Sequence, residues 1–173
     1  METYDLEIPV GEPYFVGLMS DTHGSGYAMN RGLIALHEAH VVLHAGDYAA
    51  DLRLAKEKPS VPFFAVRGNS ESGLSDGPSE IMLCIGEKRL FLTHSHQYHS
   101  KLSLWRLQER AAKVGADIVV YGHTHQPNVM WEDGRLFLNP GSAGFPNQGV
   151  EPSVMLLEIT PNGDMIPRTI TLP

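Results

Sequence analysis

Two histidines separated by a single residue follow an apolar run in the second half of the chain. His123 and His125 come after Ile118-Val119-Val120, a run that is typical of a buried strand. In extended backbone, residues two apart lie on the same side, so both imidazoles are expected to face one point. Neutral imidazole is a common ligand of first-row divalent metals. The pair alone is also compatible with a solvated strand end, which is the more frequent case, so a metal site requires further ligands.

Other apolar runs of the chain also end in side chains that can bind a metal. These side chains are Asp21 with His23, then Asp47, Asn69 and His94. In sheets with parallel strands, sites form beyond the carboxyl ends of the strands, so these groups could converge on one edge. Each residue alone has an ordinary explanation as a turn, a helix cap or a surface side chain. Their joint occurrence at the ends of apolar runs favours a single metal site.

The first half of the chain alternates between expected strands and expected helices. Strands are predicted over residues 14–20, 41–44 and 62–66, an amphipathic helix over 26–39 and a short helix over 51–58. This order predicts a parallel sheet with right-handed crossovers. Residues 1–13 are polar and include two prolines, so we expect an irregular lead-in there.

The second half is expected to contain more antiparallel structure. A hairpin is predicted from residues 81–85 and 89–92, followed by a helix that ends at Gly115 as its C-terminal cap. Two further hairpins are predicted to turn at Asp133-Gly134 and at Asn162-Gly163, because both dipeptides are typical of type I′ turns.

Composition narrows the function classes. The chain has 173 residues and 42% hydrophobic content, which is typical of one soluble domain, so we expect a single domain over residues 1–173. A net charge of -7 argues against binding to a long nucleic acid. The sequence has no apolar stretch of membrane-spanning length and no basic-then-apolar leader, which predicts a cytoplasmic protein without a membrane partner. The single cysteine, Cys84, lies in an apolar run and fits a reducing compartment.

The ordered set of motifs resembles a known family. The motifs are Asp21-x-His23, Gly46-Asp47, Gly68-Asn69, His94 and Gly122-His123-x-His125, and together they resemble the calcineurin-like metallophosphoesterases. The small size, residues 20–24, Thr93-His94 and Asn139-Pro140-Gly141-Ser142 are similar to the compact phosphodiesterases of the YfcE type. The resemblance implies an α/β fold, a four-layer α/β/β/α sandwich in which two mixed β-sheets are flanked by helices.

The resemblance also implies a dinuclear metal centre. Asp21, His23 and His125 would hold one ion, Asn69, His94 and His123 would hold the other, and Asp47 would bridge them. Carboxylate, imidazole and amide ligands suit Mn²⁺, Fe²⁺, Co²⁺, Ni²⁺ or catalytic Zn²⁺, and we expect two divalent ions with Mn²⁺ favoured. Two such ions about 3.5 to 4 Å apart can clamp the oxygens of a phosphoryl displacement and acidify a bridging water.

Three residues near these motifs have open roles. His96 lies two residues beyond His94 and could contact the substrate or support a ligand, but an ordinary surface histidine is as good an explanation. Arg67 could pair with a phosphate oxygen, although an exposed strand-end arginine explains it better. Ser70 stands where many metallophosphoesterases have a histidine that protonates the leaving group. The general acid is therefore left unassigned.

These expectations combine into a predicted function. The protein is expected to be a metal-dependent phosphodiesterase that cleaves a small phosphodiester by attack of a metal-bridging hydroxide, with Asp47, Asn69 and His96 as catalytic residues. A phosphomonoesterase, including one that acts on phosphoprotein, is the alternative within the same chemistry. A non-catalytic scaffold of the retromer Vps29 type is the alternative from another class. The natural substrate, the physiological metal and the oligomeric state stay open, a homo-oligomer being one option. Specificity is expected to come from residues 70–79 and 143–152.

Overall fold

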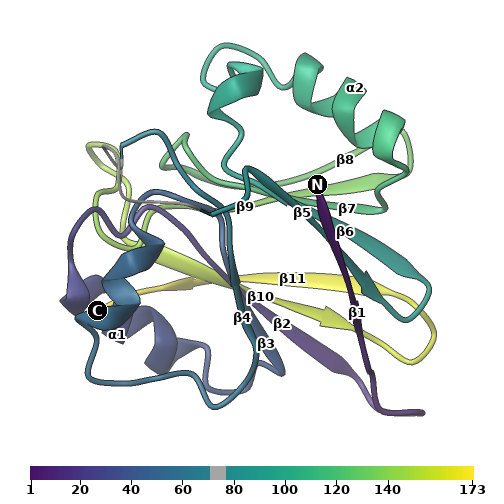
Figure 1. Ribbon diagram of the computed structural model, residues 1–173, viewed down its shortest axis with the longest axis horizontal. Coiled ribbons are helices and arrows are strands. Elements are labelled where there is room, and N and C mark those ends of the chain that lie inside the picture. Colours follow the sequence, from purple (N-terminus) through teal and green to yellow (C-terminus); the bar gives the residue numbers. More distant parts are fainter. Residues whose placement is uncertain (71–76) are drawn as a thin grey trace.

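Two β-sheets that pack face to face form the centre of the protein in the computed structural model, which describes residues 1–70 and 77–173 (Figure 1). The strands are β1 (Glu2–Leu6), β2 (Tyr14–Met19), β3 (Val41–His44), β4 (Phe63–Ala65), β5 (Glu80–Ile85), β6 (Lys88–Thr93), β7 (Ile118–Tyr121), β8 (Pro127–Glu132), β9 (Arg135–Pro140), β10 (Ser153–Ile159) and β11 (Met165–Thr171). One sheet has six strands in the order β1-β5-β6-β7-β9-β8, and the other has five in the order β11-β10-β2-β3-β4. Both sheets contain parallel and antiparallel pairs, as the predicted mixed sheets require.

One α-helix covers the outer face of each sheet. Helix α1 (Gly26–Ala35) lies against the five-stranded sheet and α2 (Trp105–Val114) against the six-stranded sheet, which gives the predicted α/β/β/α layers (Figure 1). Two 3₁₀ helices, η1 (Ala49–Arg53) and η2 (His96–Tyr98), lie in connections. In the described part of the chain, no helix has the length and apolar character that a bilayer crossing requires.

The central strands are apolar throughout because both of their faces are covered. In β3, Leu43 packs into the layer between the sheets, whereas Val42 packs toward α1. In β7, Val120 faces the layer between the sheets and Val119 faces α2. The continuous apolar runs of the sequence are therefore explained by burial on two faces rather than by alternation of apolar and polar residues.

The predicted strands of the first half are present, β3 with the predicted bounds and β2 and β4 with slightly shorter ones. Strands β2, β3 and β4 are neighbours and run parallel, as predicted. Helix α1 ends at Ala35, four residues before the predicted end at residue 39. The short helix predicted over residues 51–58 is instead the 3₁₀ helix η1.

Each of the three predicted hairpins is present, but one of the two predicted turn types is wrong. Asp133 and Gly134 both have positive φ, 48° and 74°, as a type I′ turn requires. At the other hairpin, the N–H of Gly163 donates to Thr160 O at 2.9 Å, so the central residues of the turn are Pro161 and Asn162. A type I′ turn needs positive φ at both central positions, and the pyrrolidine ring of Pro161 excludes that.

The expected irregular lead-in over residues 1–13 is wrong for its first part. Strand β1 pairs in parallel with β5 at the edge of the six-stranded sheet. Its first four residues are exposed; Leu6 packs against the layer between the sheets, and the ring of Tyr4 is centred 4.8 Å from that of Phe64. Most of the strand therefore depends on backbone pairing with a segment almost eighty positions away. Of the loop predicted over residues 70–79, positions 71–76 lie outside the described residues.

Candidate metal centre

The seven predicted ligands follow strands of both sheets. Asp21 and His23 follow β2, Asp47 follows β3, and Asn69 follows β4 in the five-stranded sheet. The other three follow strands of the six-stranded sheet: His94 after β6, and His123 with His125 after β7. Because these strands point the same way, their carboxyl ends bring the seven side chains to one end of the sandwich.

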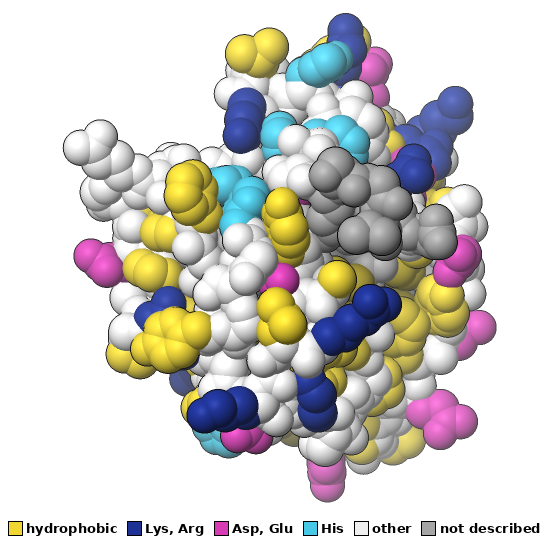
Figure 2. Space-filling view, turned by 60° about the vertical axis from the view of Figure 1, so that its left-hand side comes forward, with side chains coloured by type: hydrophobic (Ala, Val, Ile, Leu, Met, Phe, Trp, Pro, Cys, Tyr) yellow, Lys and Arg dark blue, Asp and Glu magenta, His cyan; other side chains and the backbone are white. Residues whose placement is uncertain are grey.

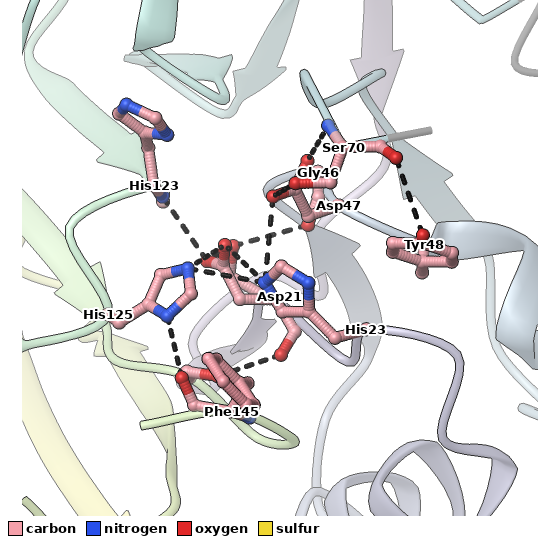
Figure 3. Close-up of polar contacts among 12 residues, drawn as sticks. Asp21, His23, Gly46, Asp47, Tyr48, Ser70, His123, His125 and Phe145 are labelled. Carbon is pink, nitrogen blue, oxygen red and sulfur yellow. Dashed lines mark hydrogen bonds and ion pairs between the residues drawn. The ribbon is translucent and has the colours of Figure 1, made fainter. Parts of the chain in front are cut away.

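The residues predicted for the first ion, called the first ligand group, are Asp21, His23 and His125. Nε2 of His125 lies 3.0 Å from Asp21 Oδ1, and Nε2 of His23 lies 3.6 Å from the same oxygen (Figure 3). The two Nε2 atoms are 3.2 Å apart. With Asp47 included, one ligand atom from each of four residues lies within 4.8 Å of the others.

The second ligand group consists of Asn69, His94 and His123. Nε2 of His94 lies 3.1 Å from Asn69 Oδ1, and the ring of His123 is centred 5.1 Å from the ring of His94. The His123 imidazole points away from Asp21 and His125 (Figure 3). The expectation that His123 and His125 face one point is therefore wrong, because both have left-handed backbone, with φ of 69° and 58°, rather than extended backbone.

Asp47 lies between the two groups. Its Oδ2 is 3.6 Å from Nε2 of His23, and its Oδ1 is 3.4 Å from Nε2 of His94. Each oxygen of this one carboxylate therefore faces a different group. A carboxylate that bridges two metal ions needs one oxygen toward each ion, as Asp47 has toward the two groups. That Asp47 bridges two ions stays a prediction.

Left-handed backbone is concentrated among these residues. Positive φ between 49° and 69° occurs at five of them: Asp21, His23, Asp47, His123 and His125. For a residue with a Cβ, such a conformation costs about 1–3 kcal/mol and persists only where the surroundings enforce it. The turns after β2, β3 and β7 are therefore shaped by the position that the side chains must take.

Both carboxylates are held in the charged form. Burial alone would raise the pKa of the Asp21 carboxyl, but the imidazoles of His125 and His23 hold it well below its usual range. The pKa of Asp47 is likewise lowered, because the contacts from His94 and Ser70 outweigh the effect of burial. Two negative charges thus lie close together at neutral pH, among nitrogen donors.

The Asp21 oxygen that faces the first ligand group fits a metal ligand. Asp21 Oδ1 is buried and has no well-formed hydrogen bond to another described residue. A buried carboxylate oxygen without such a partner is costly unless something else satisfies it. The surrounding donors are carboxylate oxygens and imidazole nitrogens, a set that suits Mn, Fe, Co, Ni or catalytic Zn.

Two imidazoles are oriented through their Nδ1 atoms. Nδ1 of His94 lies 2.7 Å from the carbonyl of Ala45, and Nδ1 of His125 lies 2.6 Å from the carbonyl of Phe145. A carbonyl can only accept, so in the neutral ring Nδ1 carries the proton and Nε2 carries the lone pair. Nε2 is the nitrogen that faces the two aspartates, so both rings are arranged as metal ligands.

Residues 15–162 match the calcineurin-like phosphoesterase superfamily domain. The chain belongs to this family. One relative is the probable metallophosphoesterase YsnB of Bacillus subtilis, which is 31% identical over 132 residues; the alignment covers 75% of each chain. Another is the phosphodiesterase MJ0936 of Methanocaldococcus jannaschii, which is 29% identical over 157 residues; the alignment covers 78% of this chain and 90% of that one. Among solved structures, the vacuolar protein sorting 29 protein of Cryptosporidium parvum superposes with a TM-score of 0.71 at 24% identity, covering 92% of this chain and 97% of that one.

The family match confirms the resemblance predicted from the motifs, and the solved structures confirm the fold class. This metallophosphoesterase carries a buried Asp/His cluster that is consistent with metal binding. The likeness to the sorting protein is a likeness of fold.

Ser70 has a supporting role that the sequence did not reveal. Its backbone N–H donates to Asp47 Oδ1 at 3.0 Å, and its hydroxyl donates to Asp47 Oδ2 at 2.7 Å. The neighbouring Gly68 leaves room for this contact, since a Cβ there would lie 1.8 Å from Asp47 Oδ1. The sequence showed Ser70 only as the residue that replaces a histidine, because its contact partner lies 23 positions away.

The segment Asn139 to Ser142 supports the ligands rather than only closing a turn. The buried amide of Asn139 donates to the carbonyl of Gly122 and to Thr124 Oγ1, each at 3.0 Å, on either side of His123. The Ser142 hydroxyl donates to the carbonyl of Asp21 at 2.8 Å. The available signal was a polar Asn139 at the end of the apolar run Leu136-Phe137-Leu138.

His96 lies beside the second ligand group. Its ring is centred 5.5 Å from that of His94 and 6.1 Å from that of His123. Its Nδ1 is buried and has no hydrogen bond to another described residue. Burial and the nearby His94 lower the pKa of His96, and the exposed Arg67 adds a smaller effect in the same direction. Both residues therefore border the site, and their roles stay predictions.

Proposed function

We propose that this metallophosphoesterase hydrolyses a small phosphodiester with two divalent ions, Mn²⁺ being favoured. The observation that carries the proposal is the convergence of Asp21, His23, Asp47 and His125, whose ligand atoms lie within 4.8 Å of one another around a buried carboxylate oxygen. The position of Asp47 between the two ligand groups supports the second ion. The relative named as a phosphodiesterase supports the reaction class.

The chain's own residues would divide the work between holding metal and binding phosphate. The first ligand group would hold one ion, the second the other, and Asp47 both. When bound, such an ion pair supplies hydroxide near neutral pH and neutralises charge on the phosphate. The carbonyls of Ala45 and Phe145 keep His94 and His125 in the ligating tautomer, and Ser70 holds Asp47.

Two residues on the open side of the site are candidates for contact with the phosphate. Asn69 is exposed, with Oδ1 near His94, so its Nδ2 can donate to a phosphate oxygen. His96 borders the second ligand group and is half-buried, so its imidazole can reach the same phosphate.

The environment of Ser70 supports a diester rather than a monoester. A positioned acid accelerates departure of a poor alkoxide by about 10²- to 10⁴-fold. Ser70 cannot be that acid near neutral pH, and its hydroxyl is engaged with Asp47. A diester carries one negative charge rather than two, and a good leaving group departs with little help. The lack of a general acid should therefore slow the hydrolysis of such diesters least.

The test compares two esters with the same leaving group. With Mn²⁺, we expect kcat/KM for bis(p-nitrophenyl) phosphate to exceed that for p-nitrophenyl phosphate by at least about tenfold, or ~1.4 kcal/mol. Excess chelator should abolish both activities, and Mn²⁺, Co²⁺ or Ni²⁺ should restore them better than Mg²⁺. The Asp47→Ala variant, purified in parallel, gives the background from contaminating enzymes.

Two outcomes would contradict the proposal. Equal or reversed values for the two esters would indicate a phosphomonoesterase, and His96→Ala should then lower the monoester rate selectively. A protein that binds metal but hydrolyses neither ester would indicate a non-catalytic function.

A further inference from the structure

Phe145 presents an exposed aromatic ring at the edge of the first ligand group. The ring is 66% exposed although its backbone is fixed at two points. Its N–H donates to Ser142 Oγ at 2.7 Å, and its carbonyl accepts from His125 Nδ1 at 2.6 Å. The same hydrogen bond that orients a ligand therefore also holds the backbone that carries this ring.

The ring lies directly beside two proposed metal ligands. It is centred 5.6 Å from the imidazole of His23 and 6.1 Å from that of His125 (Figure 3). The ring of Tyr48 lies on the other side of His23, also at 5.6 Å. The first ligand group is thus flanked by aromatic side chains.

The second ligand group has different neighbours. His96 lies beside it, with its ring centred 5.5 Å from that of His94. Figure 2 shows histidine side chains gathered on one face, with both hydrophobic and basic side chains close to them. The two flanks of the site therefore offer different contacts to the two substituents of a diester.

An isolated exposed phenylalanine needs no explanation. Phe145 differs because its carbonyl accepts from His125 and its ring lies beside His23 and His125, in the first ligand group. From this geometry we infer that Phe145 is a substrate-binding residue that stacks against an aromatic ring carried on one ester oxygen, either an aryl group or a nucleobase. The inference rests on the proposed function and adds the substrate class. The backbone at Phe145 is already held, so only the side-chain rotation of one residue is restricted when a ligand stacks on the ring.

The test measures binding to the Mn²⁺-loaded protein by titration calorimetry, with ligands that need not react. Phenylphosphonate and methylphosphonate differ by the aromatic ring, and inorganic phosphate reports on the metal centre alone. We expect phenylphosphonate to bind about tenfold more tightly than methylphosphonate, a difference of about 1.4 kcal/mol. Adenosine 5′-phosphate and ribose 5-phosphate differ by the nucleobase, so the ratio of their affinities measures the contribution of a nucleobase.

The decisive variants are Phe145→Ala and Phe145→Trp. In at least one ligand pair, Phe145→Ala should remove most of the aromatic preference and Phe145→Trp should keep it, and the pair affected distinguishes an aryl group from a nucleobase. Phosphate affinity should stay within about twofold. Trp105→Ala, which removes an exposed aromatic ring from α2, should change nothing.

The inference is overturned if Phe145→Ala keeps the preference in both pairs, or if it weakens phosphate by the same factor as the aromatic ligands. The second result would mean that Phe145 only maintains the metal centre. Diester hydrolysis is measured separately. A protein with the expected preference but no hydrolysis would contradict the proposed function alone.

Discussion

The two ligand groups have different degrees of preorganisation. In the first, Asp21 is fully buried, and both imidazole nitrogens lie within 3.6 Å of one of its oxygens. In the second, His94 is fully buried but Asn69 is exposed. The first group contains a carboxylate of its own, whereas the second has neutral ligands and shares Asp47. A fixed anionic group binds a cation more tightly than a partly exposed neutral one, so we expect one tight and one weaker metal site.

The largest effect is expected from Asp47→Ala, because this change removes the residue that both groups share. Metal content per chain should fall, and kcat/KM should drop by about 10³-fold or more, ~4 kcal/mol in transition-state stabilisation. Elemental analysis and diester kinetics measure the two effects. Far-ultraviolet circular dichroism serves as the control for folding, since a ligand at a strand end need not be essential to the core. If Asp47→Ala retained two metals per chain and a near-normal rate, Asp47 would not be the ligand that both ions share.

Single-ion ligands allow the two groups to be compared directly. His125→Ala should reduce the affinity of the tighter site, and Asn69→Ala that of the weaker site. Each protein should keep one ion, and the loss in metal affinity should be larger for His125→Ala than for Asn69→Ala. Titration of metal-free protein with Mn²⁺, followed by electron paramagnetic resonance, separates the two sites. If both variants lost the same site, the division into two groups would be wrong.

A smaller effect is expected from Ser70→Ala, which removes a support of Asp47 but no ligand. The lost hydroxyl contact, 2.7 Å in the wild type, should lower metal affinity by about tenfold and leave two ions bound at saturating metal. Ser70→Thr keeps the hydroxyl and is the matched control. An unchanged affinity in Ser70→Ala would show that the backbone N–H groups of Asn69 and Ser70 hold Asp47 without help.

The mildest perturbation is a change of pH in the metal-free protein. The charged Asp21 carboxylate, whose Oδ1 lies 3.0 Å from Nε2 of His125, raises the pKa of His125 above 6.5, whereas burial and the nearby His94 lower the pKa of His123 to about 4. His125 should therefore keep its proton above pH 6.5, and an ion entering the first group must displace it. Affinity at that group should accordingly weaken as pH falls through the pKa of His125. Imidazole resonances followed by NMR should show His125 titrating well above His123, and a common midpoint would contradict this.

The residue types at the strand ends allowed the site to be predicted better than its supports. A carboxylate or imidazole directly after an apolar run is a local signal, so Asp21, Asp47 and His94 could be found without knowing the fold. The contacts of Ser70 and Asn139 could not, because each joins segments 15 or more positions apart. The left-handed backbone at His123 and His125 was also missed, because the local pattern indicated extended backbone; only the family resemblance assigned the two residues to different ions.

The fold shows the same division between local and distant causes. The cap at Gly115, which has φ of 67°, follows from its own lack of a side chain and was predicted. Strand β1 was not predicted, because it is exposed and is specified by pairing with β5 rather than by a pattern of its own. The turn at Pro161-Asn162 was wrongly predicted as a type I′ turn at Asn162-Gly163, because an Asn-Gly dipeptide is a strong signal for that turn type.

Anomalous scattering from a crystal grown with Mn²⁺ tests the central claim most directly, because it locates each ion independently of activity. We expect two peaks about 3.5–4 Å apart. One should contact Asp21, His23 and His125, the other should contact Asn69, His94 and His123, and Asp47 should lie between them. A single peak, or two peaks that do not share Asp47, would contradict a dinuclear centre built from these two groups.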